Sequence, residues 1–578
     1  MHDRRPGPAF RKALAAALAL GASACATLPA AQHTGQLTAS AGGAPETIQI
    51  LALNDFHGNI EVPGSETSYQ SGSERRQELL GGAARLGAAL AGLREGQPNT
   101  ITIAAGDLIG ASPLPSAYYL DEPAILALNR MGLELAAVGN HEFDRGTAEL
   151  RRMQQGGCER HATREPCALD KPFEGARFGF LAANVIDEQG QTLFPGTAIR
   201  AFGGVRLGFI GMTLKETATL SSPAGTAGYR FADEADTANA EARRLLDEGA
   251  DAVVLLIHQG VIVDPYNNVT GCPQAEGDLL LILDRLDPAI RLVVSGHTHN
   301  AYVCEVPTTD GTPRLLTSAG RYGAFVTDIS MTVDPAADRV LALAATNHPV
   351  SAAGGEQADI AALVARYTSA VAPIASRVVG RLEGSFDRPD GDTDSPLGNL
   401  IADAQLAAAR DPAKGGAQIA FINSGGVRTS FRPAPDGTVT FGQIFALQPF
   451  GNTLVVLEMT GAELKRVLEQ QFTDAAPAAA RSSMLIPSEG FTFAYDRTRP
   501  PGERIVELEL HGEPIAPDRS YRVAVNNFLS SGGDGFTTLS ESRAVGDAGV
   551  DIDALEAHIA ATGTVPETGR IVDRTPAQ

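Results

Sequence analysis

The segment Leu135–Gly146, with the sequence LAAVGNHEFDRG, places metal-binding and proton-carrying side chains directly after an apolar run. The run LAAV has the character of a buried strand and is followed at once by Gly-Asn-His-Glu. Asp144 lies three residues after His141. Because asparagine and histidine offer donor atoms to metals, and a histidine beside a carboxylate suits proton transfer, the segment predicts a reactive site at a strand end.

Four further apolar runs end in the same way. They are TIQILAL, TITIAA, DAVVLLI and RLVVS, and the polar residues that follow them are Asp55, His57, Asp107, His258, His297 and His299. Each short motif alone is typical of a turn or of a buried histidine with a local partner. In open α/β sheets, however, ligands bind beyond the carboxyl ends of the strands. We therefore expect two Asp, one Asn and five His to meet in one site.

The chemistry of this set favours two divalent metal ions. Mixed oxygen and nitrogen ligands suit Zn²⁺, Mn²⁺, Fe or Co²⁺ better than Ca²⁺ or a metal that prefers thiolates. Two ions roughly 3.5–4 Å apart need a bridging carboxylate, and a bridging hydroxide is then a nucleophile at neutral pH. The pattern predicts in-line displacement at phosphorus.

The elements that must position these residues alternate between strands and helices from residue 47 to about 340. Apolar residues spaced three and four apart predict amphipathic helices over 81–95, 122–132 and 237–249. Strands that alternate with such helices indicate α/β layering.

A second α/β unit follows a connecting helix. The segment 356–380 predicts that helix, broken near Pro373, and helices are expected again over 395–410 and 459–472. With 578 residues the chain is too long for one hydrophobic core. The expected division is a signal peptide (1–27), a tether (28–46), a first domain (47–345), a linking helix (346–378) and a second domain (379–575).

The N-terminus predicts export. A basic stretch, MHDRRPGPAFRK, precedes the short apolar run ALAAALALGA and the small-residue segment ASACATLPA, which is typical of a signal peptide. Cys25 is an alternative attachment point for a lipid, although Ala22 stands where a lipobox usually has Leu. We expect a periplasmic or cell-surface protein, anchored as a lipoprotein if Cys25 is acylated.

The remaining cysteines fit an oxidising compartment. Four remain, and the preferred pairs are Cys158–Cys167 and Cys272–Cys304, although four cysteines allow three connectivities. The net charge of −22 argues against a nucleic-acid groove, so local cations must attract any phosphate-bearing ligand. No exposed heptad or long apolar patch suggests an obligate oligomer, and a monomer is expected.

The order D-x-H, GD, GNHE-x-D, H and GH-x-H resembles the calcineurin-like metallophosphoesterases. With the second unit, residues 47–575 resemble the bacterial 5′-nucleotidase family, which includes UDP-sugar hydrolases and 2′,3′-cyclic-nucleotide phosphodiesterases. The resemblance implies a four-layer αββα sandwich, a linking helix and a C-terminal α/β nucleotide-binding domain.

Metal ligands follow from the same resemblance. One metal would be held by Asp55, His57, Asp107 and His299, and the other by Asp107, Asn140, His258 and His297. His299 stands where some relatives carry Gln or Asn. His141, oriented by Asp144, would stabilise the phosphoryl transition state and assist the leaving oxygen.

Substrate contacts are expected from the second domain. The motifs NSGGVR, LQPFGN and NNFLSSGGDGF resemble the family's nucleotide-binding motifs; they supply Asn423, Arg428, Phe450, Phe528 and Asp534. Arg428 would bind phosphate, the two Phe would clamp the base and Asp534 would bind ribose; Asn423 matches less closely. Some relatives have a further phosphate-binding Arg ahead of the LGNL segment, and Arg388 is the nearest candidate here.

The sequence therefore predicts an exported dimetal phosphohydrolase that releases phosphate from nucleoside 5′-monophosphates by attack of a metal-bound hydroxide. Hydrolysis of 2′,3′-cyclic nucleotides and 3′-nucleotides, or of UDP-sugars, is the nearest alternative. A thiosulfate-ester hydrolase is disfavoured by the Phe450 and Phe528 pair. A non-catalytic nucleotide-binding surface protein would be expected to have lost a metal ligand or the His141–Asp144 pair, and every one is present.

Overall fold

The computed structural model describes residues 44–162, 164–221, 223–389, 393–472 and 484–576. The predicted signal peptide (1–27), with Cys25, lies outside these residues, as does the predicted tether up to residue 43. None of the described helices is long and apolar enough to cross a membrane.

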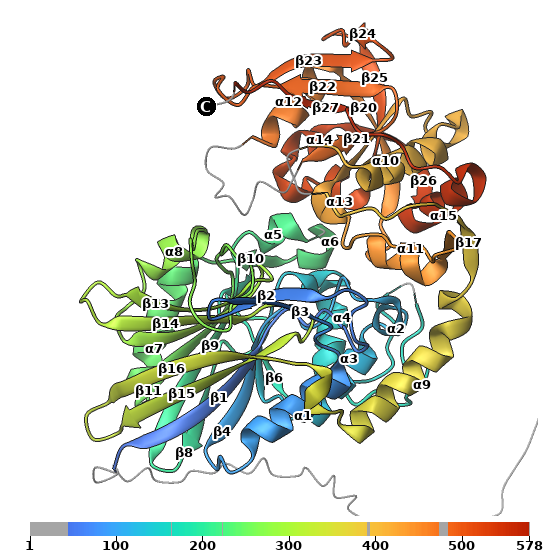
Figure 1. The fold of residues 1–578 in the computed structure, drawn as a ribbon. Helices are drawn as coiled ribbons and strands as arrows, with labels where there is room; N and C mark the ends of the chain where they lie inside the picture. Colours follow the sequence, from blue (N-terminus) through green and yellow to red (C-terminus); the bar gives the residue numbers. More distant parts are fainter. Residues whose placement is uncertain (1–43, 163, 222, 390–392, 473–483, 577–578) are drawn as a thin grey trace, which may run out of the picture. The chain divides into compact units, whose positions relative to one another are not determined.

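Two six-stranded sheets form the N-terminal domain (Figure 1). The first sheet has the order β16 (Arg339–Pro349), β15 (Phe325–Asp334), β1 (Glu46–Leu53), β4 (Thr100–Ala105), β5 (Leu135–Ala137) and β6 (Gly179–Leu181). The second has the order β13 (Ala301–Pro307), β14 (Pro313–Ala319), β12 (Ile290–Ser295), β11 (Ala252–His258), β9 (Val205–Thr213) and β8 (Thr197–Phe202). Strands β1, β4, β5 and β6 are parallel, as are β9, β11, β12 and β14, so in each sheet several carboxyl ends share one edge.

Three apolar layers hold this domain together and confirm the four-layer αββα sandwich. Residues such as Ile50 of β1 and Val254 of β11 pack between the sheets. The outer face of the first sheet packs against α1 (Ala83–Arg94), α3 (Glu122–Met131) and α4 (Gly146–Gln155), and that of the second against α7 (Glu234–Asp247) and α8 (Asp278–Leu283). Since both faces of each sheet are covered, the central strands are continuously apolar rather than alternating.

The linking helix differs from the prediction in two respects. Helix α9 (Ala358–Ala375) begins later than the predicted segment 346–378, because residues up to Pro349 belong to β16 and Ala352–Gly354 form a 3₁₀ turn. The helix is also unbroken at Pro373, which lies in its last turn. A proline there removes a single hydrogen bond, and the buried face of the helix, including Leu363 and Tyr367, fixes its path through that turn.

The C-terminal domain is built on a five-stranded sheet in the order β21 (Leu485–Pro487), β18 (Ile419–Asn423), β25 (Ser520–Asn526), β20 (Thr453–Thr460) and β26 (Arg543–Val550). Helices α10 (Pro396–Ala409), α12 (Gly461–Gln470) and α15 (Asp551–Thr562) pack on it. A smaller sheet contains β24 (Glu513–Pro514), β23 (Ile505–Leu510), β22 (Phe491–Tyr495) and β27 (Ile571–Asp573). Thr460 and Glu463 form a reciprocal capping box that begins α12.

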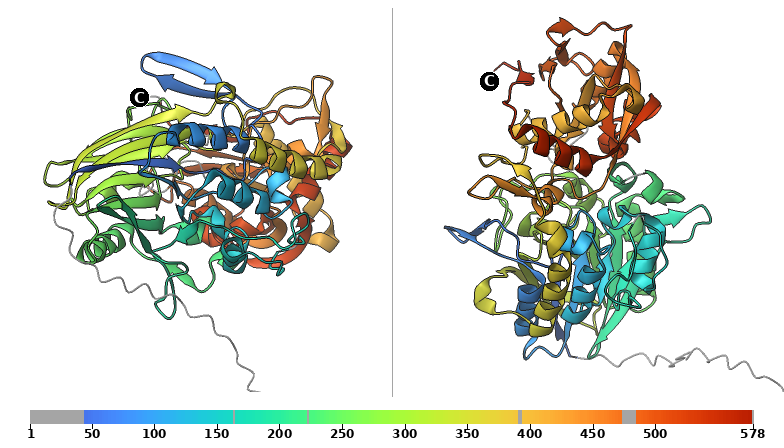
Figure 2. Two further views of the ribbon diagram at one scale, coloured as in Figure 1. Left: turned by 90° about the horizontal axis from the view of Figure 1, so that it is seen from below. Right: turned by 90° about the vertical axis from the view of Figure 1, so that its right-hand side faces the viewer.

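Shorter elements complete the described chain. The strand pairs are β2 (Thr67–Ser71) with β3 (Glu74–Glu78), β7 (Val185–Asp187) with β10 (Tyr229–Phe231), and β17 (Val378–Arg381) with β19 (Thr438–Thr440). The short helices are α2 (Leu114–Ala117), α5 (Thr217–Leu220), α6 (Pro223–Thr226), α11 (Phe441–Leu447), α13 (Asn527–Ser530) and α14 (Thr537–Glu541). The β2–β3 hairpin, which the sequence did not predict, projects from the N-terminal domain (Figure 2).

Both predicted disulfides are confirmed. Cys158 pairs with Cys167, and Cys272 pairs with Cys304, with Cα–Cα distances of 5.5 Å and 5.3 Å. The second bridge ties the loop after β11 to strand β13.

Replacing Asp551 by Asn is expected to stabilise the protein at pH 8 more than at pH 5. This carboxyl is 1% exposed, and burial raises its pKa to about 7 although Ile552 N–H donates to it. The unfolded carboxyl titrates near 3.9, so wild-type stability falls as pH rises from about 4 to about 7, by about 2–4 kcal/mol. Thermal unfolding at both pH values measures the difference.

Asp553→Asn is the matched control, because Asp553 is exposed in the same helical turn. A gain for Asp551→Asn that is equal at pH 5 and pH 8 would show that ionisation of Asp551 is not its cause.

Candidate metal centre

The carboxyl ends of the parallel strands bring the predicted metal ligands together. Asp55 and His57 follow β1, Asp107 follows β4, Asn140 follows β5, His258 ends β11, and His297 and His299 follow β12. Five of these residues adopt positive φ angles, between 45° and 70°: Asp55, His57, Asp107, His297 and His299. Residues other than glycine rarely adopt this conformation, and backbone strain of this kind clusters at functional sites.

One cluster consists of Asp55, His57 and His299. The Nε2 atoms of the two imidazoles are 3.1 Å apart, and Oδ1 of Asp55 is 3.3 Å from Nε2 of His299. Asp55 Oδ1 is buried and has no hydrogen-bond partner among the described residues. A carboxylate oxygen and two imidazole nitrogens that converge in this way fit a divalent cation.

The second cluster consists of Asp107, His258 and His297, with Asn140 beside it. Asp107 Oδ2 is 3.0 Å from Nε2 of His258, and Asn140 Oδ1 is 3.1 Å from Nδ1 of His297. The same Asp107 oxygen is only 3.6 Å from Nε2 of His57 in the first cluster. Asp107 therefore lies where a carboxylate could bridge two metals.

Backbone carbonyls orient two of the imidazoles. His57 Nδ1 donates to the carbonyl of Gly110 at 2.9 Å, and His258 Nδ1 donates to the carbonyl of Ala105 at 2.8 Å. Each bond fixes the proton on Nδ1 and directs the Nε2 lone pair into the cluster, as outer-shell partners of metal-binding histidines do.

The charges of Asp55 and His297 fit cation binding. At His258, burial lowers the pKa but Asp107 raises it by more, to about 10, so this ring must lose a proton when a metal binds. Burial raises the pKa of Asp55, but His299 and His57 lower it by more, so the net pKa lies well below its ordinary value and the carboxylate is ionised. Burial, together with His258, lowers the pKa of His297 to about 4, which keeps that ring neutral. Ionised carboxylates and neutral imidazoles are the forms that bind metals.

His141 and Asp144 form a pair beside the clusters. The carboxylate oxygens of Asp144 are 3.0 and 3.1 Å from Nδ1 of His141, and the His141 ring lies 5.1 Å from that of His57. Burial lowers the pKa of His141, yet Asp144 and Asp107 raise it by more, so the net pKa is raised. The net shift therefore favours the charged form of the ring.

Glu142 is a residue whose role the sequence did not reveal. Its buried carboxylate accepts hydrogen bonds from the backbone N–H groups of Asp107, Leu108 and Gly139, at 2.9, 2.7 and 2.5 Å. It thereby fastens the loop after β4 to the loop after β5. The signal was present as the Glu of GNHE, but its partners are backbone groups, which no sequence motif marks.

The predicted substrate residues of the C-terminal domain fall into two groups. Phe450 stacks on His141 with ring centroids 5.9 Å apart, and the Arg428 guanidinium lies 5.6 Å from the Phe450 ring centre. Asn423 Nδ2 donates to Asp534 at 2.6 Å. Phe528 packs against Gly533, where a Cβ atom would lie 2.5 Å from its ring. Phe450 thus lies against His141 beside the metal-binding clusters, with Arg428 next to it. Among the described residues, no direct ring contact joins Phe450 to Phe528.

Two family models match the two domains. Residues 48–301 match the calcineurin-like phosphoesterase model, and residues 378–541 match the model of the 5′-nucleotidase C-terminal domain. A 5′-nucleotidase precursor from Thermus thermophilus has a similar structure, with a TM-score of 0.74 at 26% identity, over 92% of this chain and 100% of that one. The chain belongs to the 5′-nucleotidase family.

Curated relatives of this 5′-nucleotidase family member include longer proteins. It is 29% identical to endonuclease YhcR of Bacillus subtilis over 84% of this chain and 37% of YhcR. It is 30% identical to cell wall protein Lmo0130 of Listeria monocytogenes over 88% of this chain and 66% of that protein. The chain thus spans less than two thirds of the length of both relatives.

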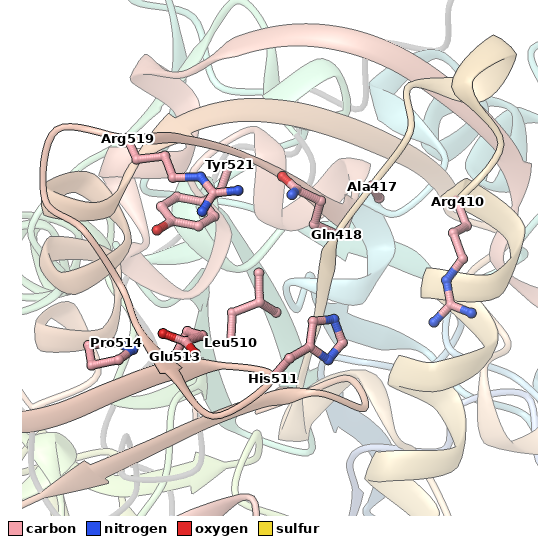
Figure 3. Close-up of a pocket in the computed structure, with 9 residues that line it drawn as sticks. All are labelled: Arg410, Ala417, Gln418, Leu510, His511, Glu513, Pro514, Arg519 and Tyr521. Atoms are coloured by element: carbon pink, nitrogen blue, oxygen red, sulfur yellow. The ribbon is translucent and has the colours of Figure 1, made fainter.

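A separate cavity of about 610 Å³ lies in the C-terminal domain of this family member, between Arg410, His511 and Arg519 (Figure 3). Its lining shares no residue with the predicted site. Arg410 forms an ion pair with Glu489, and Arg519 lies over the ring of Tyr521, so both cations already have partners.

Proposed function

We propose that this protein is a metal-dependent phosphohydrolase that releases phosphate from nucleoside 5′-monophosphates. The observation that carries the proposal is the position of His141, which lies beside the two metal-binding clusters and stacks on Phe450 of the second domain. A nucleotide whose phosphoryl group lies at the clusters would thus have Phe450 within reach for stacking on its base, and Arg428 would lie beside that ring.

Seven residues are proposed as metal ligands. Asp55, His57, Asp107 and His299 would hold one ion, and Asp107, Asn140, His258 and His297 would hold the other, with Asp107 shared. When bound, the two ions would supply Lewis-acid activation of water and neutralise charge on the phosphoryl oxygens. The chain's own contribution is a fixed set of donor atoms, held by backbone bonds to His57 and His258.

His141 is proposed to act on the phosphoryl group from the side facing Phe450. Its Nδ1 proton is held by Asp144, so Nε2 is the atom free to donate to a phosphoryl or leaving oxygen. Donation at that point stabilises charge that develops as the ester bond breaks. Asp144 fixes the orientation of the ring and favours its charged form.

Substrate selection is assigned to the C-terminal domain. Phe450 would stack on the base, with Phe528 as its predicted partner in the clamp, and Arg428 would contact the phosphate. The Asn423–Asp534 pair would accept and donate hydrogen bonds at the ribose hydroxyls. Arg388 is proposed as a further phosphate contact.

The protein is also proposed to act outside the cytoplasm. Two disulfides, the predicted signal peptide and the resemblance to a protein named as a cell wall protein support an exported location. We also propose that Cys25 is the site of lipid attachment and that the protein is a monomer.

Phosphate release from a substrate panel tests the proposal. Purified protein with added Mn²⁺ would receive 5′-AMP, 3′-AMP, 2′,3′-cyclic AMP or UDP-glucose, the last with a coupled phosphatase. We expect kcat/KM to be highest for 5′-AMP. Turnover confined to the cyclic and 3′ substrates would reassign the substrate while keeping the metal chemistry, and no turnover of any nucleotide would refute the proposed function.

A further inference from the structure

One peptide group, between Gly110 and Ala111, contacts both functional parts of the metal centre. Its carbonyl accepts the hydrogen bond from Nδ1 of His57 at 2.9 Å, and its N–H group donates to Oδ2 of Asp144 at 3.2 Å. The fit is close, because a Cβ atom at Gly110 would lie 2.8 Å from the same Asp144 oxygen. A movement of this peptide group would therefore disturb a proposed metal ligand and the partner of His141 together.

Asp121 holds the same segment through the N–H group of Gly110, which donates to its Oδ2 at 3.3 Å. That oxygen also accepts from Nη1 of Arg145 at 2.5 Å, and the other carboxylate oxygen accepts from Oγ of Ser116 at 2.7 Å. Asp121 is fully buried, and the Arg145 side chain is 23% exposed. Hydrogen bonds between charged partners are shorter and stronger than neutral ones, so this ion pair gives the segment a firm attachment.

The conformation of Asp121 indicates that its side chain has a role other than helix capping. Asp121 directly precedes α3, a position where aspartate usually accepts a hydrogen bond from the first turn of the helix. In the described first turn of α3, however, no N–H group bonds to its side chain. Its φ angle is 64°, in the left-handed region, which costs a residue other than glycine about 1–2 kcal/mol. Strain of this kind is typical of functional sites, and the contacts with Gly110 and Arg145 give it a purpose.

Arg145 connects this ion pair to Asp144, the residue that precedes it in the chain. Asp121 binds both the Arg145 guanidinium and the N–H group of Gly110. The peptide group after Gly110 in turn donates to Asp144. The backbone bond between Asp144 and Arg145 therefore closes a ring of contacts, and a fully bonded network of this kind is rigid.

We propose that Asp121, through its ion pair with Arg145, is a positioning residue for the reaction. It fixes the Gly110–Ala111 peptide group, whose carbonyl orients His57 and whose N–H group orients Asp144. The inference rests on the proposed function, in which His57 binds a metal and Asp144 orients the proton donor. Loss of the ion pair is therefore expected to weaken metal binding and proton donation together.

The test compares Asp121→Asn with wild-type protein on 5′-AMP and on p-nitrophenyl phosphate, at saturating Mn²⁺. The amide keeps the size of the side chain but removes the charge that pairs with Arg145. We expect kcat for 5′-AMP to fall about tenfold or more, with KM changed less than about threefold. The fall in kcat should be smaller for p-nitrophenyl phosphate, because p-nitrophenolate can leave without being protonated.

Metal binding by metal-free protein gives a readout that does not depend on turnover. Titration with Zn²⁺ in competition with a chromophoric chelator should show about tenfold weaker binding for Asp121→Asn, because His57 is less firmly oriented. Glu122→Gln is the matched control, since Glu122 is the next residue and is also buried, but its bonds go to Arg152 and to the Cys167 N–H group. We expect this control to lower the melting temperature and to leave the ratio of the two kcat values and the Zn²⁺ affinity unchanged.

Two substitutions of Arg145 provide an independent check. Arg145→Lys keeps the positive charge and Arg145→Gln removes it, so the lysine variant should retain the higher kcat for 5′-AMP. Thermal unfolding shows which variants are folded, and the Arg145 variants decide the question if Asp121→Asn is not.

Three results would overturn the positioning role of Asp121. They are wild-type kcat and Zn²⁺ affinity in folded Asp121→Asn, equal losses of kcat on the two substrates, and wild-type kcat in Arg145→Gln. Failure of the proposed function is recognised separately, because wild-type protein would then release no phosphate from 5′-AMP. The Zn²⁺ titration would still compare the variants in that case.

Discussion

Replacing Asp107 by Asn is expected to lower kcat for 5′-AMP at least about a thousandfold. The Asp107 carboxylate lies between the two clusters, with Oδ2 3.0 Å from Nε2 of His258 and 3.6 Å from Nε2 of His57. An amide keeps the size of the side chain but removes its negative charge and one acceptor oxygen. We therefore expect weaker metal binding as well as the loss of turnover, measured as phosphate release in Mn²⁺ and as metal bound per chain.

Asp284→Asn is the control for this prediction, because Asp284 is exposed at the end of α8. Thermal unfolding of both variants shows whether they are folded. If folded Asp107→Asn retained wild-type turnover, the bridging position assigned to Asp107 would be wrong.

Replacing His141 by Ala is expected to lower kcat for 5′-AMP by about 10²–10⁴-fold while both metals remain bound. The ring is not among the proposed metal ligands, and it lies between Asp144 and Phe450. The fall in kcat should be smaller for p-nitrophenyl phosphate than for 5′-AMP, because p-nitrophenolate can leave without being protonated. Steady-state kinetics on both substrates, with metal analysis of the variant, give the comparison.

Asp144→Asn is a second variant with a milder expected effect. It keeps the His141 ring and weakens only the orientation and the charge of that ring. We expect its loss of kcat to be smaller than that of His141→Ala. A His141→Ala protein that had lost its metals, or that kept wild-type kcat, would contradict the role assigned to this histidine.

The strand ends account for most of what the sequence predicted correctly. Parallel strands buried on both faces are recognisable as apolar runs, and the carboxyl ends of neighbouring parallel strands share one edge of their sheet. The residues after β1, β4 and β5 therefore lie together, as do those after β11 and β12, and the packing of the two sheets against each other joins the two groups. The cysteine pairs were predicted from the even number of remaining cysteines and from the short spacing between Cys158 and Cys167. The αββα layering needed the family resemblance, because alternation of strands and helices alone indicates only an α/β fold.

Elements held by backbone contacts or by tertiary packing were not predictable in this way. Strand β3 reads ERRQE and lacks an alternating apolar face, so its pairing with β2 has no sequence signal. Pro373 suggested a broken helix, but the buried face of α9 outweighs the one lost hydrogen bond. Within the described part of the chain, Glu142 has only backbone partners.

Arg321 shows a further limit of sequence reasoning. It lies in none of the recognised motifs, 22 positions after His299 along the chain. Only the fold shows that one of its Nη atoms is 3.4 Å from Nδ1 of His299.

Anomalous X-ray diffraction from crystals grown with Mn²⁺ tests the central claim most directly. We predict two anomalous peaks about 3.5–4 Å apart, one bounded by Asp55, His57 and His299 and the other by Asp107, His258 and His297, with Asp107 touching both. A single peak, or peaks elsewhere in the chain, would contradict the two-metal centre and every role derived from it.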